Sequence, residues 1–293
     1  MKQTFIGIVF AVTLIFFINC TFHHKTLFSI EDSSTLETIL TKASEYCSQL
    51  NELSVSFVCI EKTSEKKSYS LSREDPKSRP DNWLSHSNPP VINLHKRGKN
   101  VFVFEYQFAR KNYHIAEKRI LLEENGQKKH LENARIQTNY YGYEHVLFKP
   151  IVFLSESFQS EYEFKLIKED NYKGERAYII KAISSSPQTS TITNGKIWIC
   201  QSDFSILKME WEQTSVKNYG GTAIIAMSLH ALPNFKFSAE FNTEHNGIRF
   251  PTQFRFKELY VFKRGGKRYL RTDLAVKYED LQFLSTETHQ LAK

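Results

Sequence analysis

Apolar and polar residues alternate one by one through most of the chain after Asn100. In residues 100–111, aromatic side chains stand at every second position, with valine or polar residues between them. Residues 234–262 hold two such arms on either side of Asn246-Gly247, a dipeptide that favours a tight hairpin turn. A period of two residues is typical of strands that have one packed face and one solvated face.

Further turn signals divide this region into short strands. They are Asn125-Gly126, the segment 171–174 and Gly265-Gly266, and residues 195–213 have the pattern of a strand, a turn and a second strand. Short strands joined by local turns predict an antiparallel meander. Strands do not alternate with helical segments in the sequence, so a parallel sheet is not expected.

Residues 34–53 have the periodicity of a helix instead. Ser34 is followed three residues later by Glu37, a pair typical of a capping box with Ser34 as the N-cap. A helix with one apolar stripe must lie on another element, so this helix is expected to cover the sheet. The stripe recurs at helical spacing through Leu36, Ile39, Leu40, Ala43, Cys47 and Leu50, with Tyr46 beside it.

Two segments interrupt the β pattern. Residues 63–99 follow a first predicted strand at 53–62. They are polar and contain four prolines, which predicts a long flexible insertion. Residues 144–158 have consecutive rather than periodic apolar residues, interrupted by Pro150. This second segment is expected to form a short helix or a lid against the apolar face.

The sequence therefore predicts a fold that is mainly β with α. We expect a single curled antiparallel sheet, an incomplete β-barrel, with an N-terminal amphipathic helix and a short lid segment. A single domain is expected over residues 34–293, with the polar insertion inside it. Residues 1–20 are predicted to be a signal peptide and residues 21–33 a tether.

The N-terminus predicts export, either to the periplasm or to an anchored position on the periplasmic face of a membrane. Lys2 precedes an apolar run from Thr4 to Ile18, which is the pattern of a secretory signal. The run is shorter than the roughly 20 apolar residues of a spanning helix, so an uncleaved anchor is the alternative. Cys20 lies where a lipoprotein signal places its acylated cysteine, which leaves lipidation and simple cleavage both open.

The charge of the chain changes this picture little. Of 293 residues, 24% are charged, and the formal net charge is +7. The basic residues form short clusters, at 95–97, 128–130 and 263–271, rather than the continuous basic face of a nucleic-acid binder. Nucleic acid is therefore not expected as a partner. Solvated turns explain the charge, and so does weak attraction to anionic lipid headgroups or polyanionic envelope material.

The cysteines are expected to be structural. Export implies an oxidising compartment in which disulfides persist. Apart from Cys20 the chain has Cys47, Cys59 and Cys200, so at most one internal bridge forms, and Cys47 with Cys59 is the expected pair. Cys200 is expected to be a small buried apolar residue of a strand. No cysteine pair has C-x-x-C spacing and no histidine cluster lies nearby, so no metal site is expected.

Sequence motifs of catalysis are absent. The sequence has no glycine-rich phosphate loop, no G-x-S-x-G and no H-E-x-x-H, so neither an enzyme nor a cofactor is expected. The paired carboxylates of a glycosidase are assembled in space rather than in sequence, which keeps a hydrolase open as an alternative.

Four phrases of the sequence carry a resemblance to known proteins: EYCSQLNELSVSFVCIEK, VFEYQFARK, GKIWICQSDFSILKMEWE and NGIRFPTQFRFKE. With its order of export signal, amphipathic helix, meander and lid, the chain resembles the superfamily of periplasmic lipoprotein carriers and sorting proteins. That superfamily includes LolA, LolB and the amino-terminal domain of RseB, and closer in these phrases are exported bacterial proteins whose function is not established. The resemblance spans residues 36–288. The insertion at 63–99 departs from the pattern, and no arginine can be matched to the one that holds a carrier's lid.

The resemblance implies an incomplete β-barrel wrapped around a helix. It also implies a binding protein that does no chemistry and takes acyl chains or lipidated protein. Envelope protein partners and a membrane contact through the N-terminus are expected as well. The apolar trough for the ligand is expected to be lined by Phe104, Tyr106, Phe164, Trp211, Phe254 and Phe256.

Two other functions remain open: an envelope scaffold or stress-sensing domain that binds protein partners, and a hydrolase. One helix and one lid segment are the only visible cover for a wide apolar face, which favours an open trough. An open apolar cavity would favour lipid binding, and a filled core would favour the scaffold. A cleft of acids with perturbed pKa values would favour an enzyme.

Overall fold

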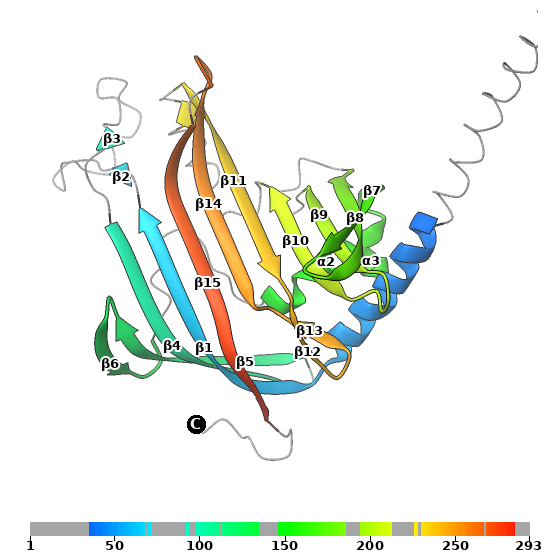
Figure 1. Ribbon diagram of the computed structural model, residues 1–293, viewed down its shortest axis with the longest axis horizontal. Coiled ribbons are helices and arrows are strands. Elements are labelled where there is room, and N and C mark those ends of the chain that lie inside the picture. Colours follow the sequence, from blue (N-terminus) through cyan, green and yellow to red (C-terminus); the bar gives the residue numbers. More distant parts are fainter. Residues whose placement is uncertain are drawn as a thin grey trace, which may run out of the picture.

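One antiparallel sheet of eleven strands dominates the structure (Figure 1). The computed structural model describes residues 35–67, 70–71, 92–93, 98–111, 113–134, 146–185, 194–212, 226–227, 230–266 and 268–284. The strands of the sheet are β1 (Val55–Lys67), β4 (Gly98–Lys111), β5 (His114–Glu124), β6 (Gln127–Leu131), β7 (Tyr162–Tyr172), β8 (Glu175–Ser184), β9 (Gly195–Cys200), β10 (Ile206–Glu212), β11 (Ala231–Glu240), β14 (Gln253–Phe262) and β15 (Arg268–Leu284).

The predicted fold class is confirmed. Across the sheet the strand order is β6-β5-β4-β1-β15-β14-β11-β10-β9-β8-β7, so the two edge strands do not pair with each other and the sheet is not closed. The first strand, β1, pairs with β4 on one side and with the last strand, β15, on the other. The first and last strands of the sheet are therefore neighbours. Two short ladders accompany the sheet: β2 (Ser70–Leu71) with β3 (Ile92–Asn93), and β12 (Thr243–His245) with β13 (Ile248–Phe250).

The hairpin turns form where the asparagine–glycine pairs predict them. Asn125 and Gly126 have φ values of 50° and 83° between β5 and β6, and Asn246 and Gly247 have φ values of 51° and 76° between β12 and β13. Two successive residues with positive φ are the requirement of a tight turn whose twist matches the strands. These dipeptides therefore fix the local register of both hairpins.

β1 is longer than the sequence pattern predicts. It continues to Lys67, where it still pairs with Gly98 on β4 and with Thr272 on β15, so the predicted insertion begins too early at residue 63. The alternation is hidden because Glu61, Thr63 and Glu65 occupy the positions of β1 that face the packed side of the sheet. Within the rest of the predicted insertion, β2 and β3 are described and the other residues lie outside the described chain.

Helical segments cover one face of the sheet. A long helix occupies residues 35–52 of the described chain, beside the β7–β10 end of the sheet (Figure 1). The predicted cap, Ser34, lies outside the described residues. The predicted lid consists of a short 3-10 turn, η2 (Val146–Phe148), followed by α2 (Lys149–Leu154) and α3 (Glu156–Gln159). No helix among the described residues has the length and apolar character needed to cross a membrane.

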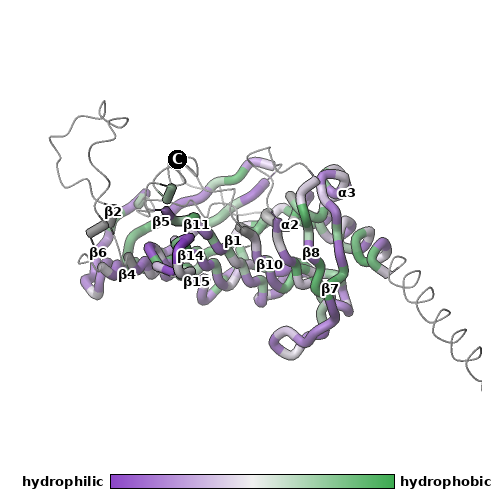
Figure 2. Tube along the Cα trace, turned by 90° about the horizontal axis from the view of Figure 1, so that it is seen from above, coloured by the Kyte–Doolittle hydropathy of each residue, from purple (hydrophilic) through white to green (hydrophobic). Residues whose placement is uncertain are grey.

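A single large cluster of buried side chains joins the long helix, the lid and the sheet. The helix contributes its predicted stripe, with Ile39, Ala43 and Cys47 almost fully buried, and the lid contributes Phe153 and Leu154. On β11, buried and more exposed residues alternate, which places Phe235, Phe237 and Ala239 on the packed face. In Figure 2, hydrophobic and hydrophilic segments alternate along the strands of the sheet.

Arg110, near the end of β4, connects three parts of the fold. Its guanidinium donates from Nη1 to the carbonyl oxygen of Leu50 at 2.9 Å and from Nη2 to that of Asn51 at 2.7 Å. These carbonyls belong to the last turn of the long helix, where backbone acceptors have no helical partner. The same guanidinium lies 4.3 Å from the ring centroid of Phe148 in the lid. One buried cation therefore fixes the helix end and the lid against the sheet.

Gln159 makes a second polar tie between the lid and the long helix. Its side-chain amide donates to the carbonyl oxygen of Leu40 at 3.0 Å and to that of Leu154 at 2.8 Å. The lid is thus held by one hydrogen-bonding amide, one cation–π contact and the burial of its apolar residues.

We expect the Arg110→Ala substitution to lower the free energy of unfolding by about 3 kcal/mol. Hydrogen bonds to charged groups contribute about 1.5–3 kcal/mol, and the substitution leaves the helix-end carbonyls without a donor. Urea denaturation followed by circular dichroism measures the loss. Arg176→Ala is the matched control, because Arg176 makes an exposed ion pair with Glu169 that should contribute at most about 1 kcal/mol. Equal losses in the two variants would contradict the role given to Arg110.

Candidate functional site

The six residues predicted to line the trough lie on the packed side of the sheet. Tyr106, Trp211, Phe254 and Phe256 belong to the large cluster, and Phe164 packs against it while partly exposed. The sixth residue, Phe104, lies apart in a smaller cluster with Phe102 and Leu121. The structure therefore brings five of the six into one region.

This region is closed rather than open. Phe254 is 0% exposed, Phe256 is 1% exposed and Trp211 is 4% exposed. The ring of Trp211 stacks on that of Phe237 with centroids 5.7 Å apart, and Phe237 contacts Phe256 at 5.0 Å. The cover that looks too small in the sequence fills the space, because Phe153 and Leu154 of the lid and the stripe of the long helix all point into it. The expectation of an open trough is thus not met at these residues.

Beside the apolar region, the packed face carries a buried ion pair that the sequence did not indicate. Arg119 on β5 donates from Nε and Nη2 to the two carboxylate oxygens of Glu61 at 3.0 Å each, and Glu61 is fully buried. The Arg119 guanidinium also lies 4.2 Å from the ring centroid of Tyr106, whose hydroxyl donates to Glu117 at 2.7 Å. Burial raises the pKa of Tyr106, which keeps that hydroxyl a donor.

A second buried ion pair lies further along the same face. Arg271 donates to Glu258 at 2.8 Å, and the hydroxyl of Tyr260 donates to the same carboxylate oxygen at 2.8 Å. Thr272 donates to the other oxygen of Glu258 at 3.2 Å. Buried charges need such partners to offset their lost hydration. The packed face therefore has an apolar part under the helices and a charged part on β1, β5, β14 and β15.

A third polar cluster holds the β12–β13 hairpin to the long helix. The backbone N–H of Arg249 donates to the hydroxyl of Tyr46 at 3.1 Å, and its Nε donates to Ser205 at 2.6 Å. Its terminal nitrogens pair with Glu175 at 3.0 and 2.5 Å. Burial raises the pKa of Tyr46 to about 12, so this contact does not titrate in the physiological range.

The carboxyl groups with shifted pKa values have the character of ion-paired surface acids. The Lys168 ammonium holds the pKa of Asp170 below its ordinary value. Burial works to raise the pKa values of Asp203 and Glu240. Hydrogen bonds from Ser205 outweigh it at Asp203, and the Lys173 ammonium outweighs it at Glu240, so both pKa values are lowered. A general acid needs the opposite direction of shift.

Cys47 and Cys59 do not form the predicted bridge in the structure. Both are free thiols, each almost fully buried in the large cluster. Burial raises the pKa of each thiol to about 12. Because the thiolate is the reactive form, packing in the apolar interior keeps both side chains unreactive. Cys200 is also free and buried, as predicted for a small apolar residue.

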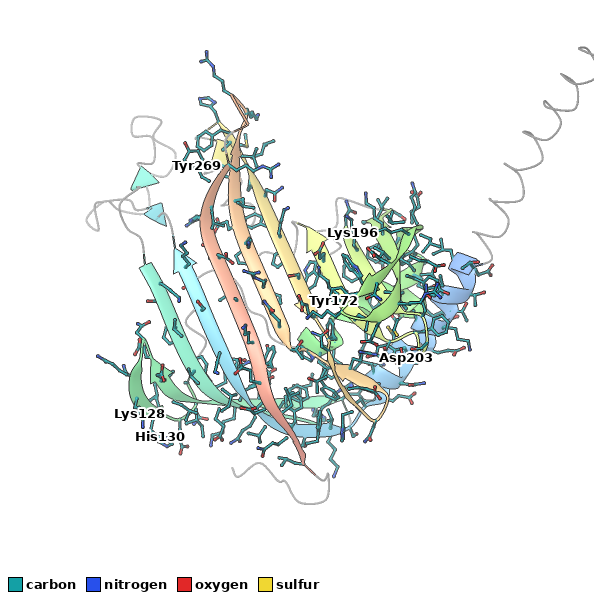
Figure 3. The ribbon with its side chains drawn as sticks, in the orientation of Figure 1. Lys128, His130, Tyr172, Lys196, Asp203 and Tyr269 are labelled. Carbon is teal, nitrogen blue, oxygen red and sulfur yellow. The ribbon has the colours of Figure 1, made fainter. Side chains whose placement is uncertain are left out.

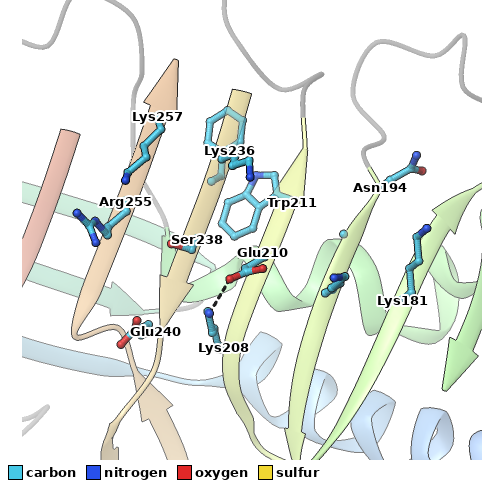
Figure 4. Close-up of a pocket in the computed structure, with 13 residues that line it drawn as sticks. Lys181, Asn194, Lys208, Glu210, Trp211, Lys236, Ser238, Glu240, Arg255 and Lys257 are labelled. Atoms are coloured by element: carbon cyan, nitrogen blue, oxygen red, sulfur yellow. Dashed lines mark ion pairs between the residues drawn. The ribbon is translucent and has the colours of Figure 1, made fainter. Parts of the chain in front are cut away.

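The opposite face of the sheet carries a hollow of about 610 Å³ (Figure 4). Lys236, Ser238 and Glu240 line it from β11, at the positions that alternate with the packed Phe235 and Phe237. A second hollow of about 490 Å³ adjoins it and shares Arg255. We call the two together the basic groove. The cations that line the larger hollow are Lys181, Lys196, Lys208, Lys236, Arg255 and Lys257.

Side chains of the basic groove come from strands that are distant in the sequence. Lys208 pairs with Glu210 at 2.6 Å, as the dashed line in Figure 4 marks, and Lys196 stands on the neighbouring strand β9 (Figure 3). Among the described residues, no group of three or more His, Cys, Asp or Glu side chains could hold a metal ion.

Comparison with known proteins finds only distant similarity to solved structures. No model of a protein family matches the sequence, and no curated protein matches it. Similar solved structures include an outer membrane lipoprotein-sorting protein domain from Vibrio parahaemolyticus, with 10% identity, a TM-score of 0.37 and coverage of 86% of this chain and 94% of that one. A LolA superfamily protein from Nitrosomonas europaea has 12% identity, a TM-score of 0.31 and coverage of 84% and 92%.

The protein MucB is also similar, with 8% identity, a TM-score of 0.27 and coverage of 84% of this chain and 93% of that one. At such identities and scores, the likeness assigns no ligand to this chain.

Proposed function

We propose that this protein is an exported, non-catalytic binding protein of the cell envelope. Its ligand is an acyl chain, free or attached to a lipidated protein, that enters beneath the lid. The observation that carries the proposal is the pairing of a broad aromatic face with a cover that includes two very short helices, α2 with six residues and α3 with four.

The lid is the part of the cover that can open at the lowest cost. Helices of this length are not stable alone, and neither α2 nor α3 has a side-chain hydrogen bond at its N-cap. Its closure depends on the contacts of Gln159 and Arg110 and on the burial of Phe153 and Leu154, which is worth roughly 1.5–3 kcal/mol for each side chain. An acyl chain that takes their place restores the lost burial.

The chemistry of the described acids supports binding rather than catalysis. The carboxyl pKa values with a resolved shift, those of Asp170, Asp203 and Glu240, are all lowered by hydrogen bonds or cations. The buried acids Glu61 and Glu258 are paired with arginines. Both features are typical of structural ion pairs.

A second candidate function is an envelope scaffold or stress-sensing domain that binds protein partners. The specific observation in its favour is the closed packing of Phe254, Phe256 and Trp211. The two functions differ in one measurable property, because only the first takes up lipid in the interior.

Uptake of a fluorescent fatty acid tests the proposal, and Phe153→Ala is the informative variant. Phe153 is buried under the lid and contacts Tyr162 at 5.3 Å between ring centroids. Its truncation weakens closure and leaves apolar space, so we expect uptake to be faster on the order of tenfold or more. Stopped-flow fluorescence measures the rate, and circular dichroism confirms that the variant is folded.

Phe158→Ala is the matched control, because Phe158 is the same residue type in the same lid but is 38% exposed. Its uptake rate should stay within about twofold of the wild type. A wild type and a Phe153→Ala variant that both take up no fatty acid would rule out the lipid proposal and favour the scaffold.

The proposed location in the cell envelope depends on residues outside the described chain, which are the apolar run from Thr4 to Ile18 and Cys20. If Cys20 is acylated, the Cys20→Ala variant should move from the membrane fraction to the soluble periplasmic fraction, because stable anchoring depends on the attached chains. Immunoblots of separated cell fractions measure the shift. Recovery of the wild type from the cytoplasm would contradict export.

A further inference from the structure

The basic groove is built from two adjacent rows of residues that cross the sheet. Strand pairing fixes both rows, because each residue stands opposite the next one on the neighbouring strand. The first row runs through Lys181, Lys196, Glu210, Ser238, Arg255 and Ala275 to Ser64. The second row runs from Glu212 through Lys236, Lys257, Asp273 and Lys66 to Lys99.

Like charges stand directly opposite each other at three places in these rows. The pairs are Lys181 with Lys196, Lys236 with Lys257, and Lys66 with Lys99. Opposed like charges on neighbouring strands destabilise a sheet. The three opposed lysine pairs therefore do not stabilise the sheet. Their presence favours a role in binding a ligand of opposite charge.

Internal carboxylates neutralise only part of the charge. The two rows hold seven cationic residues and three acidic ones, Glu210, Glu212 and Asp273. Asp273 is shared, at 4.0 Å from Arg255 and 3.7 Å from Lys257. Lys196 and Lys236 are exposed.

The shape of the site favours one kind of occupant. The two rows together span eight strands, from β8 to β4, which at a spacing of about 4.8 Å corresponds to a length of roughly 34 Å. An extended peptide of about ten residues has this length. A flat bilayer surface does not follow a hollow floor, so its headgroups reach only the rim of the groove.

The chemistry of the floor favours the same occupant. Glu210 and Glu240 line the groove with Ser238 and Asn194, so acceptors lie among the cations. The two carboxylates repel a uniform polyanion, whereas a polypeptide presents backbone N–H groups to them and its own carboxylates to the lysines. All but one of the cations are lysines rather than the arginines suited to bidentate phosphate recognition.

We propose that the basic groove binds an extended acidic segment of a partner polypeptide. The charged side chains of the groove alternate along the strands with the packed aromatic residues, and Trp211 and Phe237 also line the larger hollow. Peptide binding uses the charged rows and acyl-chain uptake uses the space beneath the lid, so the two depend on different side chains. A test of peptide binding therefore does not decide whether the protein takes up lipid, and a test of lipid uptake does not decide whether it binds the peptide.

Fluorescence anisotropy with the full chain tests the proposal. The probe is a fluorescein-labelled peptide of twelve residues in which glutamate and serine alternate, and the neutral control peptide carries glutamine in place of glutamate. We expect the wild type to bind the acidic peptide only, and a rise in salt from 50 to 500 mM to weaken binding on the order of tenfold or more.

The informative variant is Lys196→Glu/Lys236→Glu, which reverses two exposed cations in the groove. Lys111→Glu/Lys128→Glu is the matched control, with the same change of net charge at exposed positions of β4 and β6 outside the groove. We expect the groove variant to bind at least tenfold more weakly, and the control to stay within twofold of the wild type. Circular dichroism checks that both are folded.

Two further binding measurements use inorganic polyphosphate and vesicles of phosphatidylglycerol in place of the peptide. Failure of the wild type to bind the acidic peptide overturns the proposal, and so does equal weakening in the groove and control variants. Groove-dependent binding of polyphosphate or vesicles that is tighter than that of the peptide also overturns it, in favour of a phosphate-bearing ligand.

Discussion

The contact between Arg110 and the end of the long helix is the constraint on which the cover of the sheet depends. Arg110 stands on β4, donates to the carbonyls of Leu50 and Asn51, and packs on Phe148 of the lid. Burial lowers the pKa of Arg110 but leaves it charged, because the pKa of a guanidinium starts far above neutrality. A cation in this position is stable only when helix, lid and sheet meet around it. The same contact therefore aligns the apolar stripe of the helix with the aromatic face and closes the interior.

Much of the fold follows from the sequence, and the exceptions have physical causes. Alternation, helical periodicity and the asparagine–glycine turns predict the meander, the long helix and the hairpins, and the consecutive apolar residues at 144–158 predict the lid. The predicted end of β1 was wrong because Glu61 and Glu65 face inward, and the arginine that pairs with Glu61 lies 58 residues away in the sequence. An open trough was expected because only one helix and one lid segment were available to cover a wide apolar face. The number of apolar residues in this cover does not show how completely they fill the space above the sheet. The role of Arg110 was missed because the carbonyls that it caps are about sixty residues away in the sequence.

The two faces of the sheet differ in a way that the linear sequence conceals. The lysines of the basic groove are scattered through the sequence, and scattered basic residues gave no reason to expect a single charged surface. Strand register brings all of them except Lys208 into two rows, since β1, β4, β8, β9, β11 and β14 each contribute one or two cations. The packed face then offers apolar burial under a short lid, and the outer face offers concentrated charge. A binding protein built in this way presents two chemically different ligand surfaces on one sheet.

The central claim is that the lid opens without unfolding of the sheet beneath it. Native-state hydrogen exchange measured by mass spectrometry tests this most directly, because it reports the opening free energy of each segment. The account predicts that the backbone amides of residues 151–159 exchange orders of magnitude faster than those of β10 and β14, while the second half of the long helix, held by Arg110, exchanges as slowly as the sheet. Exchange of the lid amides at the same slow rate as the strands would show that the interior opens only by global unfolding, and would contradict the account.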